Sequence, residues 1–289
     1  MASVASASLS ASLAPQHDFG APLQTALREA GVWLVIPCYK VRDHILQVIS
    51  HAPSWIEGIV CVDDACPQGS ADFLEAQDLD GRVVVVRLPE NRGVGGAVMA
   101  GYAEAERRGG RILVKVDGDD QMDLGYLPHL VAPILLGEAD YTKGNRFTSL
   151  SHLTTMPGVR AFGNAVLSFA AKVSTGYWNV FDPTNGFTAI EASVAKQVIK
   201  RDVARRFFFE TDLLYHLGTL RAVVRDVPMP ARYGDEVSNL RISAPAEFRP
   251  SGLWPIFRPG LQRRHARDPG RGGAAGVRLA LRPELAGCA

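Results

Sequence analysis

Short apolar runs alternate with helix-like segments through the first half of this 289-residue chain. Runs of about 4–8 apolar residues that end at Gly, Pro or Asp are typical of buried strands. They occupy residues 32–36, 58–62, 83–86 and 111–116. Residues 41–51 and 93–108, which lie between them, carry apolar side chains at helical spacing. Strands separated by helices predict a largely parallel α/β sheet with right-handed crossovers.

The same two periodicities continue beyond residue 120. Pro133 is expected to bend or end the helix predicted over residues 124–136. Three aromatic residues at 207–209 predict a short strand, and residues 67–70 predict a plain turn. The remaining predicted strands cover residues 139–143, 187–190 and 222–227, and the remaining helices cover residues 25–30, 158–174, 192–199 and 210–220.

The chain is expected to hold one folded domain between two weakly patterned ends. Its length is enough for one large domain, which we assign to residues 31–242. Residues 1–30 are predicted to form a disordered Ala/Ser-rich leader and a short helix. Residues 243–289 are rich in Arg, Pro and Gly and are predicted to be poorly ordered. Nine Arg against three acidic residues over 241–289 leave a charge of +6, so binding to anionic lipid headgroups is the alternative.

Bulk composition excludes several classes of protein. The formal net charge of +1 offers no general attraction for nucleic acid. The four cysteines lack CxxC spacing, so we expect reduced thiols and no zinc site. No apolar run approaches the roughly 18 residues that span a bilayer, and the N-terminus lacks the basic start and apolar centre of a signal peptide. We therefore expect a cytoplasmic protein, with a peripheral position at the cytoplasmic membrane face as its one membrane contact.

An acidic loop directly follows the apolar run at residues 111–116. Buried parallel strands place ligand sites at their carboxyl ends, and carboxylates there suit Mg²⁺ or Mn²⁺ holding a diphosphate. Asp117, Asp119 and Gln121 alternate, so they share one side of an extended loop, and Asp120 falls on the other. A solvated acidic turn is the alternative, because Asp and Gly are both turn formers.

Two further strand ends carry residues suited to a nucleotide. Asp63 and Asp64 end a buried strand and are expected to face the same crevice as the acidic loop. The alternative, which these two residues favour when taken alone, is that they start the turn at 67–70. Asn91 and Gly93 begin a glycine-rich segment that opens a helix, where the helix dipole favours anions. That segment is neither a G-x-G-x-x-G nor a P-loop motif, which excludes a dinucleotide-binding fold and a P-loop NTPase.

Later segments offer an arginine and three carboxylates. Arg146 follows the strand after the acidic loop and is suited to pair with phosphate in a fork geometry. Asp182 lies in a turn-rich segment, whereas Glu210 and Asp212 begin a helix. The helix position leaves two roles open for Glu210 and Asp212, helix capping or general-base catalysis. Arg232 is a second candidate phosphate ligand.

Taken in this order, the motifs resemble family 2 glycosyltransferases of the GT-A fold. The resemblance is greatest to the branch that contains dolichol-phosphate mannosyltransferase and bacterial polyprenyl-phosphate sugar transferases, and it covers residues 32–242. It implies a single α/β domain with a Rossmann-like, mostly parallel central sheet flanked by helices. The matching segments are VIPCYK at 35–40, VDDACP at 62–67, NRGVGGA at 91–97, DGDDQ at 117–121, KGNRF at 143–147, TNGF at 184–187, and Arg232 with SNL at 238–240.

The resemblance also implies a role for each matching residue. A divalent metal, Mg²⁺ or Mn²⁺, is expected on Asp117, Asp119 and Gln121, of which the two Asp match the family's DxD-type motif. The implied nucleotide-sugar site comprises Pro37, Tyr39, Asp63, Asp64, Asn91, Gly93, Asp117 and Gly118. The implied phosphate and acceptor site comprises Arg146, Arg232 and Ser238. The candidate catalytic residues are Asp119, Asp182, Glu210 and Asp212.

The expected reaction is inverting transfer of a hexose from a UDP- or GDP-linked sugar to a dolichyl or undecaprenyl phosphate. A saccharide hydroxyl in polysaccharide or lipopolysaccharide assembly is the alternative acceptor, and it would require a base. A lipid phosphate is already ionised, so positioning suffices. Two other classes were weighed, a nucleotidyltransferase and a non-catalytic nucleotide-sugar-binding module. Residues 37–40 disfavour the nucleotidyltransferase, which would place a glycine-rich basic loop after its first strand.

Overall fold

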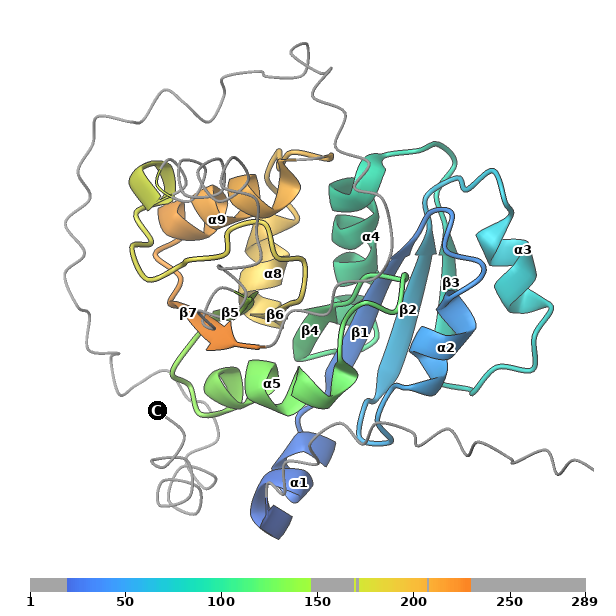
Figure 1. Ribbon diagram of the computed structural model, residues 1–289, viewed down its shortest axis with the longest axis horizontal. Coiled ribbons are helices and arrows are strands. Elements are labelled where there is room, and N and C mark those ends of the chain that lie inside the picture. The colour runs from blue at the N-terminus through green and yellow to red at the C-terminus, as the bar shows by residue number, and fades with distance from the viewer. Residues whose placement is uncertain (1–19, 147–168, 170–171, 207, 230–289) are drawn as a thin grey trace, which may run out of the picture.

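The computed structural model describes residues 20–146, 169, 172–206 and 208–229, and these form one α/β domain around a seven-stranded sheet. The strands lie in the order β3-β2-β1-β4-β6-β5-β7 (Figure 1). Only β6 is antiparallel to its neighbours; every other pair is parallel. The bounds are β1 Val32–Cys38, β2 Gly58–Asp63, β3 Val83–Arg87, β4 Ile112–Lys115, β5 Tyr141–Asn145, β6 Thr188–Glu191 and β7 Val224–Pro228.

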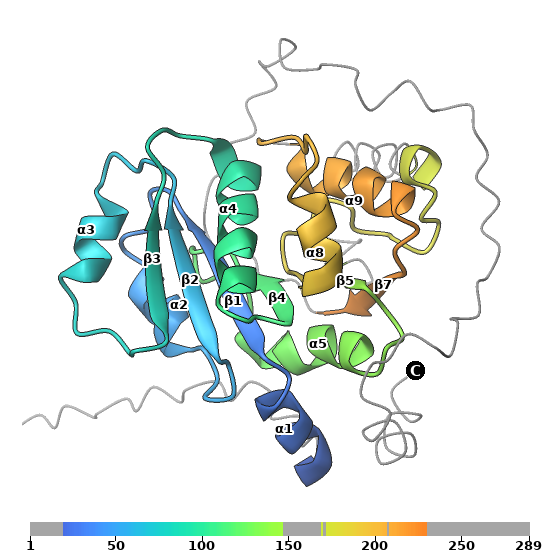
Figure 2. The ribbon, with the colours of Figure 1, turned by 180° about the vertical axis from the view of Figure 1, so that it is seen from behind.

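Helices cover both faces of the sheet, so strand residues are buried whichever way they point. Along β1, Val32, Leu34 and Ile36 enter one core, whereas Trp33 and Val35 enter the other. The first core is covered by α1 Gly20–Arg28, α2 Ile45–Ser50, α3 Ser70–Glu75 and α5 Leu127–Leu135, the last preceded by the 3-10 turn η1 Leu124–Tyr126. The second core is covered by α4 Gly93–Arg107, α8 Ala192–Val198 and α9 Phe209–Thr219, seen from their own side in Figure 2.

The predicted α/β class and its alternating elements are confirmed, with boundaries that shift by a few residues. Pro37 was expected to end the first strand, but β1 continues to Cys38. The reason is that β1 pairs with β4 only as far as Val35, so a proline beyond that point lies on an open edge and is tolerated. Pro133 lies inside α5, which ends two residues later at Leu135.

One helix was missed and one predicted strand was wrong. The turn predicted at 67–70 is present at residues 67–68, and helix α3, which was not predicted, begins at Ser70 after Gly69 at φ 63°. The described residues of the strand predicted at 207–209 are not extended, because Phe208 lies in a turn and Phe209 is the first residue of α9. Phe209, Leu213 and Leu217 are buried at intervals of four residues, a helical spacing that overrides aromatic strand propensity.

The predicted leader and tail, the larger part of the helix predicted over 158–174, Arg232 and Ser238 lie outside the described residues. Among the residues that are described, no helix is both long and apolar enough to cross a membrane.

Helix α4 packs against β1 and β2 at a position where only glycine fits. A Cβ on Gly101 would collide with Val35 Cγ1 and lie 3.1 Å from Val62 Cγ2. This close approach holds α4 against the strands whose carboxyl ends carry the candidate site.

We expect Gly101→Ala to lower the free energy of unfolding. Overpacking costs about 1–3 kcal/mol, which opposes the gain of at most about 1 kcal/mol that Ala brings to a helix. Chemical denaturation monitored by circular dichroism measures the difference. The matched control is Gly81→Ala, because a Cβ there would meet no atom within 4 Å. Equal stability of the Gly101 variant and the control would contradict the close packing.

Candidate active site

A cavity of about 150 Å³ lies at the carboxyl end of β4. The acidic loop contributes Asp117, Asp119 and Gln121 to its lining, and Arg146 with residues 184–187 contributes further lining. Asp120 is not among the lining residues; its carboxylate lies 3.2 Å from His51 Nδ1. The predicted grouping of three side chains is therefore present. The three side chains were expected to share one side of an extended loop. They lie together instead because the loop forms a turn, in which Asp120 adopts φ 60°.

The oxygen atoms in this cavity fit a divalent metal that also carries a diphosphate. Asp117 and Asp119 provide carboxylates, and Gln121 provides an amide oxygen. Mg²⁺ is usually held by one or two carboxylates, with substrate phosphates and water completing its shell. Within the described residues, no group of three or more His, Cys, Asp or Glu side chains could hold a metal alone. The donor set thus fits a metal shared with substrate.

Lys115 is a site residue that the sequence reasoning missed. Its side chain is 2% exposed, and its Nζ lies 2.8 Å from Asp117 Oδ1 and 3.3 Å from Glu210 Oε1. Burial alone would lower the pKa of Lys115, but the two carboxylates outweigh burial and the pKa is raised. Lys115 therefore links α9 to the acidic loop. A signal existed, because lysine inside an apolar strand is rarely buried unless it is paired.

A second buried lysine lies two strands away in the sheet. Thr188 of β6 pairs with Lys115 on one side and Lys143 on the other, so the three side chains form a row. Lys143 is fully buried and donates a hydrogen bond to the carbonyl of Asn185. Burial lowers the pKa of Lys143 to about 8. At the next residue, a Cβ on Gly186 would collide with Lys115 Nζ, so the turn that lines the cavity lies directly on buried charge.

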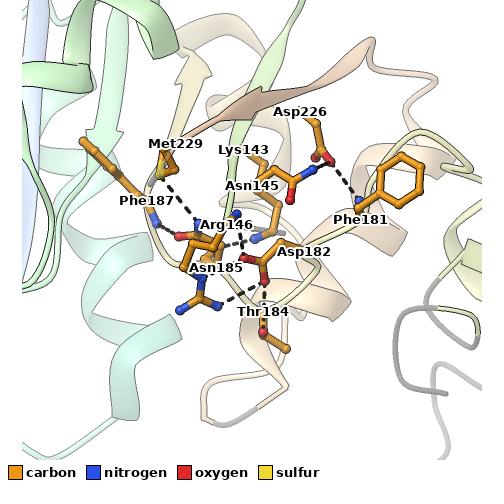
Figure 3. Close-up of polar contacts among 10 residues, drawn as sticks. All are labelled: Lys143, Asn145, Arg146, Phe181, Asp182, Thr184, Asn185, Phe187, Asp226 and Met229. Carbon is orange, nitrogen blue, oxygen red and sulfur yellow. Dashed lines mark hydrogen bonds and ion pairs between the residues drawn. The ribbon is translucent and has the colours of Figure 1, made fainter. Parts of the chain in front are cut away.

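Arg146 is held by Asp182 in a two-pronged ion pair (Figure 3). Arg146 Nε donates to Asp182 Oδ2 at 2.7 Å, and Nη2 donates to Oδ1 at 3.1 Å. The Asp182 side chain is 0% exposed, whereas that of Arg146 is 38% exposed and lines the cavity. Asp182, predicted as a candidate base, is therefore the buried partner of a cavity-lining cation.

Asp226 of β7 joins the end of β5 to the segment that carries Asp182 (Figure 3). Its Oδ2 accepts hydrogen bonds from Asn145 Nδ2 at 2.9 Å and from the Phe181 backbone N–H at 2.8 Å. Its Oδ1 is buried and has no hydrogen-bond partner among the described residues. Burial raises the pKa of Asp226 to about 6.

Asp63 and Asp64 are occupied by backbone donors. Asp63 Oδ1 accepts from Cys66 N at 2.7 Å, and Oδ2 accepts from Ala71 N at 2.8 Å. Asp64 Oδ1 accepts from Arg92 N at 2.6 Å. Both side chains are buried. They hold the loops at this edge of the sheet, and the contacts of Asp63 with Cys66 N and Ala71 N agree with the alternative role of starting the turn at 67–70.

The other donor-site candidates form one continuous edge with the acidic loop. Asn91 Nδ2 donates to the Asp64 carbonyl at 3.2 Å, which places the start of α4 and Gly93 beside β2. Pro37 and the exposed Tyr39 lie at the end of β1, and Gly118 packs against Val41 just beyond them. The structure thus brings these candidates to one edge of the sheet.

Three of the four candidate catalytic residues, Asp182, Glu210 and Asp212, do not line the cavity. Asp212 is held by its own helix and by the segment before it. Its Oδ2 accepts from Ala204 N at 2.7 Å and lies 3.5 Å from His216 Nε2. Glu210 is engaged with Lys115, as Asp182 is with Arg146. Of the four candidate catalytic residues, only Asp119 lines the cavity.

Comparison with known proteins agrees with this geometry. Residues 33–199, which make up more than half of the chain, match the sequence profile of glycosyl transferase family 2. The chain is a family 2 glycosyltransferase. Its curated relatives include the UDP-N-acetylglucosamine–dolichyl-phosphate N-acetylglucosaminyltransferase of Methanococcus voltae, 24% identical over 70% of this chain and 86% of the relative. The undecaprenyl-phosphate mannosyltransferase of Micrococcus luteus is 25% identical over 68% of this chain and 82% of its own length.

Solved structures confirm the fold of this glycosyltransferase. Glucosyl-3-phosphoglycerate synthase of Mycobacterium tuberculosis, determined with Mn²⁺, UDP and glucosyl-3-phosphoglycerate, superposes with a TM-score of 0.55. The match covers 74% of this chain and 75% of the synthase, at 19% identity. The predicted family and the predicted GT-A fold are both confirmed, and the two curated relatives carry names of the predicted branch.

We expect Lys115→Met to destabilise the glycosyltransferase by about 3–5 kcal/mol, because it leaves Asp117 and Glu210 without their buried cation. Adding Glu210→Gln should recover part of the loss by removing one of the two uncompensated charges. Denaturant unfolding gives each value. Lys196→Met is the control, because its pair with Glu106 is 60% exposed at the lysine and such pairs contribute about 0–1 kcal/mol. Similar losses at both lysines would contradict the buried network.

Asp226 should make stability depend on pH between about 4 and about 6. The folded protein binds this proton more tightly than the unfolded chain, so unfolding releases it and the free energy of unfolding falls as pH rises. Asp226→Asn removes the effect, so the variant should gain stability relative to the parent from pH 4 to pH 6. Urea unfolding of both proteins at each pH measures the difference, and a difference independent of pH would refute the assignment.

Proposed function

We propose that this enzyme transfers a hexose, with inversion, from a UDP- or GDP-linked sugar to a polyprenyl phosphate. The observation that carries the proposal is one cavity that combines the oxygen ligands Asp117, Asp119 and Gln121 with the cation of Arg146. A nucleotide diphosphate and a lipid phosphate both require such a combination of metal ligands and a fixed cation. The names of the Methanococcus voltae and Micrococcus luteus relatives support the same acceptor class.

A divalent metal, Mg²⁺ or Mn²⁺, belongs to the proposal. When bound, such an ion acts as a Lewis acid that stabilises negative charge on the departing diphosphate. Asp117, Asp119 and Gln121 are the residues that would hold it. Lys115 fixes Asp117 Oδ1 from the protein side, which orients the carboxylate before substrate arrives. The structural relative with Mn²⁺ and UDP supports metal use.

The occupied state of the carboxylates favours a phosphate acceptor over a saccharide hydroxyl. A hydroxyl needs a base within hydrogen-bond reach. Each candidate base, Asp182, Glu210 or Asp212, is already bound to a protein partner. A lipid phosphate is ionised before it binds, so the chain needs only to orient it and exclude water. Because such a lipid resides in a membrane, the proposal includes peripheral action at the cytoplasmic membrane face.

The matched pair Asp119→Asn and Asp120→Asn tests the metal site. Asp119 lines the cavity and Asp120 does not, although they are neighbours. We expect Asp119→Asn to lower transfer by about 100-fold or more, since a metal contributes several kcal/mol and 1.4 kcal/mol is tenfold. Asp120→Asn should remain near the parent, because Asn also tolerates the left-handed backbone at this position.

The assay has two stages. A thermal-shift panel of UDP-glucose, UDP-N-acetylglucosamine and GDP-mannose with Mn²⁺ first identifies the donor, because a ligand that binds only the folded state raises the melting temperature. Transfer of the labelled sugar to undecaprenyl phosphate is then compared with transfer to free saccharides. Transfer to saccharides alone, or equal activity of the two Asn variants, would overturn the proposal.

A further inference from the structure

We infer that Asp182 is a positioning residue, which acts only by fixing the guanidinium of Arg146 for a phosphate oxygen. The inference rests on the proposed function and deepens it. It gives Asp182 a role other than the base that its place in the sequence suggested. Three features of the structure carry it: the occupancy of both carboxylate oxygens, the position of Arg146, and the rigid attachment of the turn that bears Asp182.

Both oxygens of Asp182 are engaged within the protein. Besides the two guanidinium contacts, Oδ2 lies 3.3 Å from the Arg146 backbone N–H, and Oδ1 lies 3.3 Å from Thr184 Oγ1. The side chain is also fully buried. A base must meet the acceptor proton at hydrogen-bond distance. Asp182 would have to break the ion pair to do so, whereas it holds Arg146 in its present position.

Arg146 has its charged group at the boundary between protein and cavity. One edge of its guanidinium contacts buried Asp182, and the side chain lines the cavity that also contains Asp117 and Asp119. Arginine recognises phosphate through a planar fork whose direction matters. Because Asp182 accepts hydrogen bonds from one edge of the Arg146 guanidinium, it fixes the orientation of the guanidinium plane relative to the cavity.

The turn that carries Asp182 is attached to β5 on both sides of that residue (Figure 3). Before it, the Phe181 N–H and Asn145 Nδ2 share Asp226 Oδ2. After it, the Asn185 carbonyl accepts from Lys143, and Asn185 Oδ1 accepts from Phe187 N at 2.9 Å. Lys143 and Asn145 of β5, with Arg146 directly after it, thus connect the end of this strand to residues 181–187. Asp182 and the backbone of Arg146 belong to one hydrogen-bonded unit.

Charge and position predict opposite effects for Asp182→Asn. The substitution removes the anion that partly neutralises Arg146, so attraction for phosphate should not weaken. It also weakens the grip on the fork, and a misplacement near 1 Å can cost about 100-fold in rate. We therefore expect kcat to fall by about 10- to 100-fold, while KM for the phosphate-bearing substrate stays level or falls.

The test is a double-mutant cycle between Asp182→Asn and Arg146→Ala, assayed with Mn²⁺, the donor found above and farnesyl phosphate. If Asp182 acts only through Arg146, Asp182→Asn lowers kcat in the parent but by less than about twofold in the Arg146→Ala background. An equal loss of kcat in both backgrounds would show that Asp182 has an independent role, such as that of a general base. No loss of kcat in the parent background would show that Asp182 has no role in the reaction. Either outcome overturns the inference.

Separate KM measurements for donor and acceptor in Arg146→Ala identify which phosphate the arginine meets, and a rise in either KM is the expected result. Unchanged values for both would also overturn the inference. The number of Mn²⁺–nucleotide sites per chain, determined by calorimetry, corrects kcat for any unfolded fraction of a variant. Glu138→Gln is the matched control, because it removes the carboxylate from an exposed arginine pair with Arg225 and should leave kcat unchanged. Failure of the parent to transfer to farnesyl or undecaprenyl phosphate would refute the proposed function and this inference together, whereas an additive cycle in an active parent would refute only the inference.

Discussion

Charge buried in the sheet is the constraint on which the rest of this active site depends. Lys115 and Lys143 lie in the protein interior, where an unpaired ammonium group would be costly. Lys115 is balanced by Asp117 and Glu210, and Lys143 is satisfied by the Asn185 carbonyl. The acidic loop, helix α9 and the turn at 181–187 are therefore each attached to the sheet by a buried cation.

The antiparallel strand β6 makes this arrangement possible. It lies between β4 and β5, and its Thr188 pairs with Lys115 on one side and Lys143 on the other. The acidic loop after β4 and the residues after β5 therefore begin from neighbouring positions in one sheet. β4 leads into the acidic loop, and β5 leads into Arg146. Because β6 lies between β4 and β5, it separates the acidic loop from Arg146, and both of these line the cavity. Gly186 lies just before β6, and a Cβ there would collide with Lys115 Nζ and lie 2.8 Å from Asp117 Oδ2.

Hydrophobic periodicity and strand ends were enough to predict most of the fold and the grouping of three candidate side chains. The apolar run at 111–116 and its acidic ending predicted that Asp117, Asp119 and Gln121 lie together, and all three line the cavity, because a strand terminus is a local feature. Glu210 lies 95 residues from Lys115, and no local pattern predicts that two such residues meet. The strand predicted at 207–209 failed for a related reason, since the burial of Phe209 depends on how α9 packs. Features that depend on a tertiary partner, such as the buried pair of Lys115 and Glu210, were thus the ones that sequence reasoning missed.

The same distinction separates two ways in which a carboxylate contributes to this enzyme. Asp119 lines the cavity, whereas Asp182 and Glu210 form ion pairs with Arg146 and Lys115 and orient these cations. The carboxylates of Asp182 and Glu210 are thus paired with cations, whereas Arg146 and the oxygen atoms of Asp117, Asp119 and Gln121 line the cavity itself. This pairing supports an acceptor that arrives already ionised. The proposed acceptor class therefore rests on where the negative charges are paired, rather than on how many there are.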